Sequence, residues 1–129
     1  MLSERAERLA RFCRERARAN LRIVVGYGAE TYVIAHIRDD LRDRYTGPEV
    51  ERMLAALRNA HDDLWVPAFI DSAVGPPKAT VHYFGDAVVV QLLVDADHGF
   101  VASFDREASP TLAEFVEECR MRVSGEMAG

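Results

Sequence analysis

Cysteine, lysine and long apolar runs are scarce in this chain of 129 residues. It has two cysteines, Cys13 and Cys119, and Lys78 is the single lysine among its 16 Lys and Arg residues. The longest apolar stretch, residues 87–94, is interrupted by Gln91, whereas a bilayer-spanning helix needs about 20 residues. No charged segment followed by an apolar one marks a secretory leader. We therefore expect a cytoplasmic protein with reduced thiols and no membrane partner.

The familiar motifs of catalysis and cofactor binding are also missing. The sequence holds no H-E-x-x-H, C-x-x-C, Walker A or G-x-S-x-G pattern. Gly26-Tyr27-Gly28 lacks the third glycine of a dinucleotide fingerprint and precedes a strand, so no helix N-terminus would receive a pyrophosphate. We predict no catalytic residue, no metal ligand and no cofactor, and this favours a noncatalytic protein.

What is present is the composition of an ordinary globular domain, with 49% hydrophobic and 29% charged residues. A chain of this length suits one domain and leaves little room for two. We predict a single α+β domain over residues 1–124 and a frayed C-terminal tail over residues 125–129.

Hydrophobic periodicity predicts the elements of this domain. Spacings of three and four predict helices over residues 3–19, 47–60 and 110–123, with Ser3 as the first N-cap and Pro48 in the first turn of the second helix. Alternating and β-branched runs predict strands over residues 21–25, 31–38, 79–84, 87–94 and 100–104. Turns are expected at 26–30, 85–86 and 95–99, a short helical turn at 39–45, and an irregular or short helical connection at 61–74.

The order of these elements, α-β-β-α-β-β-β-α, predicts a mostly antiparallel sheet of about five strands with packed helices. Residues 87–94 are apolar at both alternating sets of positions, which indicates an interior strand. The second strand should place Thr31, Val33, Ala35 and Ile37 on one face and Tyr32, Ile34 and His36 on the other. Cys13 and Cys119 each fall within the apolar stripe of a terminal helix, where they are expected to be buried or, alternatively, to form a regulated disulfide.

Two resemblances follow from this pattern. The order of elements is similar to that of the Roadblock/LC7 and profilin-like domains across nearly the whole chain. Residues 21–27, 37–42 and 79–88 resemble those of an uncharacterised haloarchaeal family of small proteins, with which the preference for arginine over lysine agrees. The first resemblance implies a homodimer formed by an edge strand and a helix, here residues 79–84 and 50–57. The second implies no catalytic residues.

An apolar cluster within the 61–74 connection is the leading candidate for a partner surface. It comprises Trp65, Val66, Phe69 and Ile70. If these side chains are exposed they would mark a protein or ligand site, and otherwise they belong to the core. A small-ligand pocket near Trp65 and His82 is an alternative hypothesis.

The first predicted helix carries six arginines against three glutamates within residues 1–20. Arg8, Arg11 and Arg14 could contact the phosphates of a nucleic acid, so this helix could associate with a nucleic acid or a transcription complex. The net charge of -5 argues against nonspecific nucleic-acid binding by the whole domain, and the alternative is a solvated helix face.

Three polar segments have a second possible interpretation as binding sites. Asp95, Asp97 and His98 could hold a divalent ion, or they could form a polar hairpin loop. His36 and His82 could meet on one face of the sheet and bind zinc, or each could be satisfied within its own strand. Residues 38–44 alternate in charge and are expected to form an ion-paired turn, with a polar ligand site as the alternative.

Overall fold

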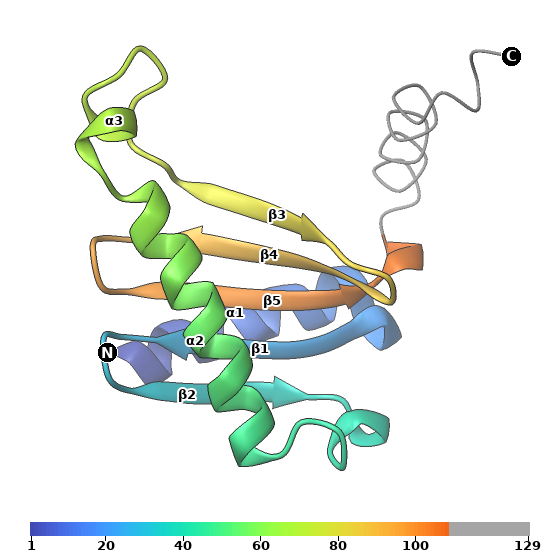
Figure 1. The fold of residues 1–129 in the computed structure, drawn as a ribbon. Coiled ribbons are helices and arrows are strands. Elements are labelled where there is room, and N and C mark those ends of the chain that lie inside the picture. Colours follow the sequence, from blue (N-terminus) through green and yellow to red (C-terminus); the bar gives the residue numbers. More distant parts are fainter. Residues whose placement is uncertain (109–129) are drawn as a thin grey trace, which may run out of the picture.

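The computed structural model describes residues 1–108, which form a five-stranded antiparallel sheet with one long helix on each face (Figure 1). The strands are β1 (Leu21–Tyr27), β2 (Tyr32–Ile37), β3 (Ala79–Tyr83), β4 (Ala87–Leu93) and β5 (Gly99–Asp105). The helices are α1 (Leu2–Ala17), α2 (Gly47–Leu64) and the short α3 (Pro67–Ile70), with 3-10 turns η1 (Arg18–Asn20), η2 (Asp39–Leu41) and η3 (Arg106–Ala108). The predicted α+β class and antiparallel sheet are confirmed.

The strands lie in the order β2-β1-β5-β4-β3, so β5 occupies the centre and β2 and β3 are the two edges. A central strand is covered on both faces, which explains why residues from Gly99 to Ser103 are buried without alternation. The interior position predicted for residues 87–94 is confirmed, because β4 pairs with both β3 and β5.

Alternate residues of β1 pack into two separate hydrophobic cores, one on each face of the sheet. Ile23 and Val25 pack with Val50 and Leu54 of α2, whereas Val24 packs with residues of α1 on the opposite face. The two helices therefore lie on opposite sides of the sheet, and Figure 1 shows α2 in front of the strands and α1 behind them.

Helix α1 approaches its face of the sheet through small residues. Ala6, Ala10 and Cys13 are buried, and burial raises the pKa of the Cys13 thiol, so this cysteine behaves as a small apolar residue. The predicted N-cap at Ser3 is wrong, because the helix already begins at Leu2. Cys119 lies outside the described residues.

The turn predicted at residues 26–30 begins two residues too early. Strand β1 continues through Gly26 and Tyr27, and the Tyr27 side chain is fully buried. The Tyr27 ring occupies the space beside Gly99, where a Cβ atom would collide with the phenol oxygen. The glycine in the neighbouring strand thus makes room for a large aromatic residue, and the chain reverses after it.

A bulge also changes the predicted faces of β2. Val24 pairs with His36 but Val25 pairs with Ile34, so Ala35 is the additional residue. The extra residue reverses the alternation, and Ile37 therefore packs in the same core cluster as Tyr32 rather than on the opposite face.

Helix α2 begins as predicted, with Thr46 accepting a hydrogen bond from the Glu49 backbone N–H and proline in the first turn. It continues to Leu64 rather than ending at residue 60, and the following connection contains α3. The short helical turn predicted near residue 39 is present as η2. The helix predicted at 110–123 and the tail lie outside the described residues. Within residues 1–108, none of the helices is long and apolar enough to cross a membrane.

Candidate functional site

A groove of about 460 Å³ lies between α2 and the β3–β4 hairpin. One wall is the middle of α2, the other is the hairpin turn, and the floor is the face of the sheet that α2 covers. The lining residues are Ile23, Tyr45, Met53, Ala56, Leu57, Phe84, Gly85, Asp86, Ala87, Val89, Val101 and Ser103.

The chemistry of this groove is almost entirely apolar. Met53 and Phe84 are exposed at its rim, and Asp86 is the single charged residue that the described part of the chain contributes to the lining. Ser103 is 3% exposed, and its hydroxyl has no hydrogen-bond partner among the described residues. A buried polar group without a partner is unfavourable and rare in native structures. The groove can therefore accept an apolar group, and Ser103 can donate or accept one further hydrogen bond.

A second, smaller hollow of about 100 Å³ lies beside a buried polar network under the C-terminal half of α2. The Gln91 Nε2 group donates to the Tyr27 oxygen at 2.9 Å, so the phenol hydrogen is free to donate to His61 Nδ1 at 2.6 Å. The other imidazole nitrogen, Nε2–H, then donates to the Asp95 carbonyl at 2.7 Å. Because a carbonyl oxygen can only accept, this pattern places a proton on His61 Nε2.

The same network continues across the sheet to the edge strand. The second Nε2–H of Gln91 donates to the Leu57 carbonyl of α2 at 2.9 Å. Its Oε1 atom lies 3.0 Å from His82 Nε2 and 3.4 Å from the Thr80 hydroxyl. Burial raises the pKa of Tyr27, so its hydroxyl stays neutral. Every member has a partner, and the arrangement joins α2 to β1, β3 and β4.

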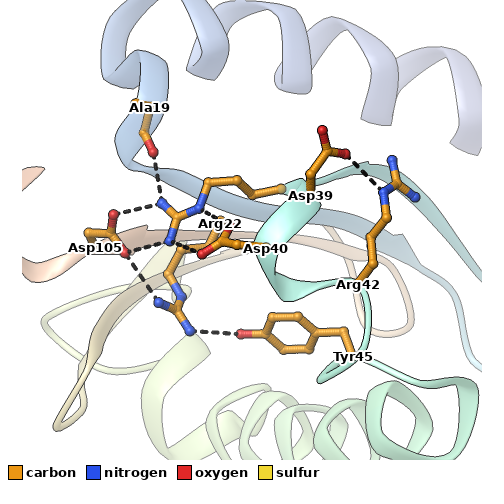
Figure 2. A network of polar contacts seen from close by, with 8 residues as sticks. Ala19, Arg22, Asp39, Asp40, Arg42, Tyr45 and Asp105 are labelled. Atoms are coloured by element: carbon orange, nitrogen blue, oxygen red, sulfur yellow. Dashed lines mark hydrogen bonds and ion pairs between the residues drawn. The ribbon is translucent and has the colours of Figure 1, made fainter.

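Charged residues gather at one end of the sheet, around the last residue of β5 (Figure 2). Asp105 accepts hydrogen bonds from Arg38 Nη1 at 2.6 Å and from Arg22 Nη1 at 3.2 Å. Arg38 also donates to the Ala19 carbonyl at 2.7 Å and to Asp40 at 2.6 Å. The hydrogen bond from Arg38, followed by that from Arg22, lowers the pKa of Asp105. This cluster binds the ends of β1, β2 and β5 together.

The polar turn predicted at residues 38–44 therefore has a definite role in the fold. Arg38 faces inward to Asp105, while Arg42 pairs with Asp39 on the surface at 3.1 Å. Because the Arg38 guanidinium is fully engaged with protein groups, this segment offers no free cation at that position for a polar ligand.

The predicted apolar cluster at residues 65–70 is divided by the structure. Phe69 is exposed, whereas Trp65, Val66 and Ile70 are half-buried. The Trp65 ring lies 5.9 Å from the His61 ring, centroid to centroid, and so helps to cover the buried network. Trp65 does not line the groove, which lies beside the middle of α2.

Arg8, Arg11 and Arg14 are all exposed on α1, and none of them forms an ion pair with another described residue. Other arginines of this helix lie over aromatic rings, with Arg5 at 5.2 Å from the Phe100 centroid and Arg16 at 4.7 Å from that of Phe12. The outer face of α1 is therefore a basic surface.

The zinc alternative for His36 and His82 is wrong, because β2 and β3 lie at opposite edges of the sheet. Asp95 Oδ1 accepts hydrogen bonds from the backbone N–H groups of Asp97 and His98 at 2.9 Å each, and it lies 2.9 Å from His98 Nδ1. The Asp97 backbone contact, followed by His98, lowers the pKa of Asp95 to about 2. This carboxylate thus stabilises its own turn, and residues 1–108 contain no cluster of three acidic, histidine or cysteine residues arranged for a metal.

The sequence analysis missed Ser103 and the partners of His61. Ser103 stands inside the apolar run of β5, and Gln91 inside that of β4. A polar residue within a run that is buried on both faces signals either a hydrogen-bonded network or a ligand site. The sequence contains this signal at both positions. It does not identify the hydrogen-bond partners, because they come from strands and a helix far apart in the sequence.

The fold and its surfaces define a class: an antiparallel α+β domain with an apolar groove beside one helix and a basic face on the other. A family model described as "Domain of unknown function (DUF7522)" matches residues 7–124. The chain therefore belongs to the DUF7522 family. No curated protein matches the sequence.

Proposed function

We propose that this domain is a noncatalytic interaction or regulatory module that forms a homodimer through β3 and α2. The observation that carries this proposal is the open edge of β3. This strand, Ala-Thr-Val-His-Tyr, has no proline, lysine or acidic residue, which are the features that usually protect an edge from pairing. Val81 is 53% exposed within it.

The face of the sheet that α2 covers carries further exposed apolar side chains beside this edge, whereas Val81 points to the opposite face. Phe84 follows β3 directly, and Met53 projects from α2; both are exposed and both line the same groove. Pairing of β3 with a second copy would extend the sheet and cover apolar surface in one step. The similarity in element order to Roadblock/LC7 domains supports the same arrangement.

The other edge, β2, is the internal control for this proposal. It is also free of charged residues, and Ile34 is 42% exposed there. However, β2 is contacted by α1, and the exposed apolar groove residues lie on the β3 side. The two edges can therefore be tested by equivalent substitutions at similarly exposed positions.

We expect the wild-type chain to sediment at about twice its monomer mass of 14.5 kDa at high micromolar concentration. Val81→Lys should weaken the dimer at least tenfold, because the two introduced lysines, one from each copy, would repel each other across the twofold axis. Ile34→Lys should leave it intact. Analytical ultracentrifugation measures both. A wild-type monomer, or dissociation by Ile34→Lys alone, would contradict the proposed interface.

Two further attributes belong to the same proposal. We infer a cytoplasmic location, supported by the low cysteine content and the buried, apolar setting of Cys13. We also infer a haloarchaeal source, supported by the preference for arginine over lysine.

Nucleic-acid association through α1 is the second candidate, and the exposed Arg8, Arg11 and Arg14 favour it. Each phosphate contact contributes about -0.9 to the slope of log affinity against log salt. We expect duplex DNA to bind at low salt, and the triple alanine variant to reduce that slope by about three. Arg52→Ala, on α2 at the opposite face of the sheet from α1, serves as the control. Absence of binding at 20 mM salt in a filter-binding or anisotropy assay would exclude this function.

A further inference from the structure

We propose that the groove between α2 and the β3–β4 hairpin binds a small, uncharged and mostly apolar molecule whose single hydroxyl or carbonyl group hydrogen-bonds to Ser103. This site is separate from the Trp65 region that the sequence analysis favoured. It also goes beyond the proposed dimer, whose interface of β3 and α2 adjoins the groove at Phe84 and Met53.

The position of Ser103 is the first argument. It lies on the same face of the sheet as Ile23 and Val89, its cross-strand neighbours on either side, and all three line the groove. An alanine would fit this apolar floor without leaving a buried hydroxyl unpaired. Ser103 is 3% exposed and its buried hydroxyl lacks a partner, so it is suited to a group supplied from outside the described chain.

The size of the groove is the second argument. Its volume of about 460 Å³ falls within the range of roughly 300–1,000 Å³ typical of small-molecule sites. Such sites are lined mainly by apolar and aromatic side chains with a few polar groups that fix the orientation of the ligand. Here Met53, Leu57 and Phe84 provide the apolar contacts and Ser103 the polar one.

The charges around the groove define the class of ligand. Among residues 1–108 its lining includes no Lys, Arg or His residue, and the exposed Asp86 at the hairpin turn would repel an anion. A cation would have to leave water for an apolar floor on which no carboxylate lies. Fused-ring or short-chain molecules with one hydroxyl or carbonyl group satisfy both conditions.

Two variants at neighbouring positions of α2 separate groove occupancy from nonspecific adsorption. Ala55 and Ala56 are both exposed on the helix, but only Ala56 lines the groove. Ala56→Trp should obstruct the groove and weaken binding at least tenfold. Ala55→Trp adds the same apolar surface outside the groove and should leave binding unchanged.

The probes are 2-naphthol and naphthalene, titrated into the full-length protein and followed by fluorescence. We expect saturable binding of both to the wild type at one site per chain. Ser103→Ala should weaken 2-naphthol about fivefold, the factor expected for one hydrogen bond of typical net strength, and should change naphthalene affinity by less than twofold. Circular dichroism confirms that each variant is folded.

Several results would overturn the proposal. Binding that does not saturate would show nonspecific adsorption only. An equal loss of probe affinity in Ala55→Trp and Ala56→Trp would show the same. If Ser103→Ala changed the affinities for 2-naphthol and naphthalene by the same factor, Ser103 would not hydrogen-bond the ligand. Absence of saturable binding to the full-length chain would overturn the proposal outright. Analytical ultracentrifugation of the same samples gives their mass. A failure of ligand binding can therefore be distinguished from a failure of dimerisation.

Discussion

Replacing His61 with alanine should lower the free energy of unfolding by about 3 kcal/mol, the middle of the range for removing a large buried side chain. The imidazole is 2% exposed and links the Tyr27 hydroxyl to the Asp95 carbonyl. Its loss leaves a cavity, deprives the phenol hydrogen of its acceptor, and removes the contact between α2 and the β4–β5 turn. Urea denaturation followed by circular dichroism measures the change.

Two comparisons separate the cavity from the lost hydrogen bonds. Tyr27→Phe keeps the ring but leaves His61 Nδ1 and one Gln91 N–H without a partner, so we expect a loss of about 1–3 kcal/mol. His98→Ala removes an exposed imidazole from the surface of its turn and should change stability by less than about 0.5 kcal/mol. If His61→Ala were as mild as His98→Ala, the network would not hold the helix to the sheet.

Replacing Asp105 with asparagine should cost about 2 kcal/mol at pH 7, somewhat less than the roughly 3–5 kcal/mol for breaking a fully buried ion pair. Its side chain is 22% exposed and accepts from both Arg22 and Arg38. The substitution keeps the size of the side chain but leaves two guanidinium groups without their shared carboxylate. Asp40→Asn removes a partner of Arg38 that is 61% exposed, and there we expect less than about 1 kcal/mol.

The same substitution should reduce the sensitivity of the protein to acid. The folded-state pKa of Asp105 is lowered, whereas its unfolded value is about 3.9. The ionised carboxylate therefore stabilises the fold fully above about pH 4, and this stabilisation is lost as the pH falls through the folded pKa. Denaturant titrations between pH 6 and pH 2 should show a shallower decline for Asp105→Asn than for the wild type. Parallel curves would show that the cluster does not couple protonation to folding.

Local pattern was sufficient to predict most of the elements. The alternation in β1 and the doubly apolar run of β4 specified strands, and Thr46 with Pro48 specified the start of α2. The errors arose where a distant residue decided the local structure. Tyr27 continues β1 because Gly99, in another strand, leaves room for its ring, and Ile37 changes face because β2 contains a bulge.

The candidate site was less predictable for the same reason. Ser103 and Met53 come together only when β5 lies in the centre of the sheet and α2 crosses it. Composition indicated an apolar cluster near Trp65, but packing directs that ring towards His61. Exposure of Arg8, Arg11 and Arg14 followed directly from helical periodicity, because a single helix determines which side faces water.

The central place of β5 has a consequence for synthesis on the ribosome. The contact between Arg22 and Asp105 spans 83 positions of sequence, and β1 reaches β4 only through the intervening β5. The edge of β1 that pairs with β5 therefore remains unpaired until nearly the whole described chain has emerged from the ribosomal exit tunnel. During that interval the nascent polypeptide offers apolar strands to chaperones or to neighbouring copies, and slowing translation before codon 99 should prolong this vulnerable period.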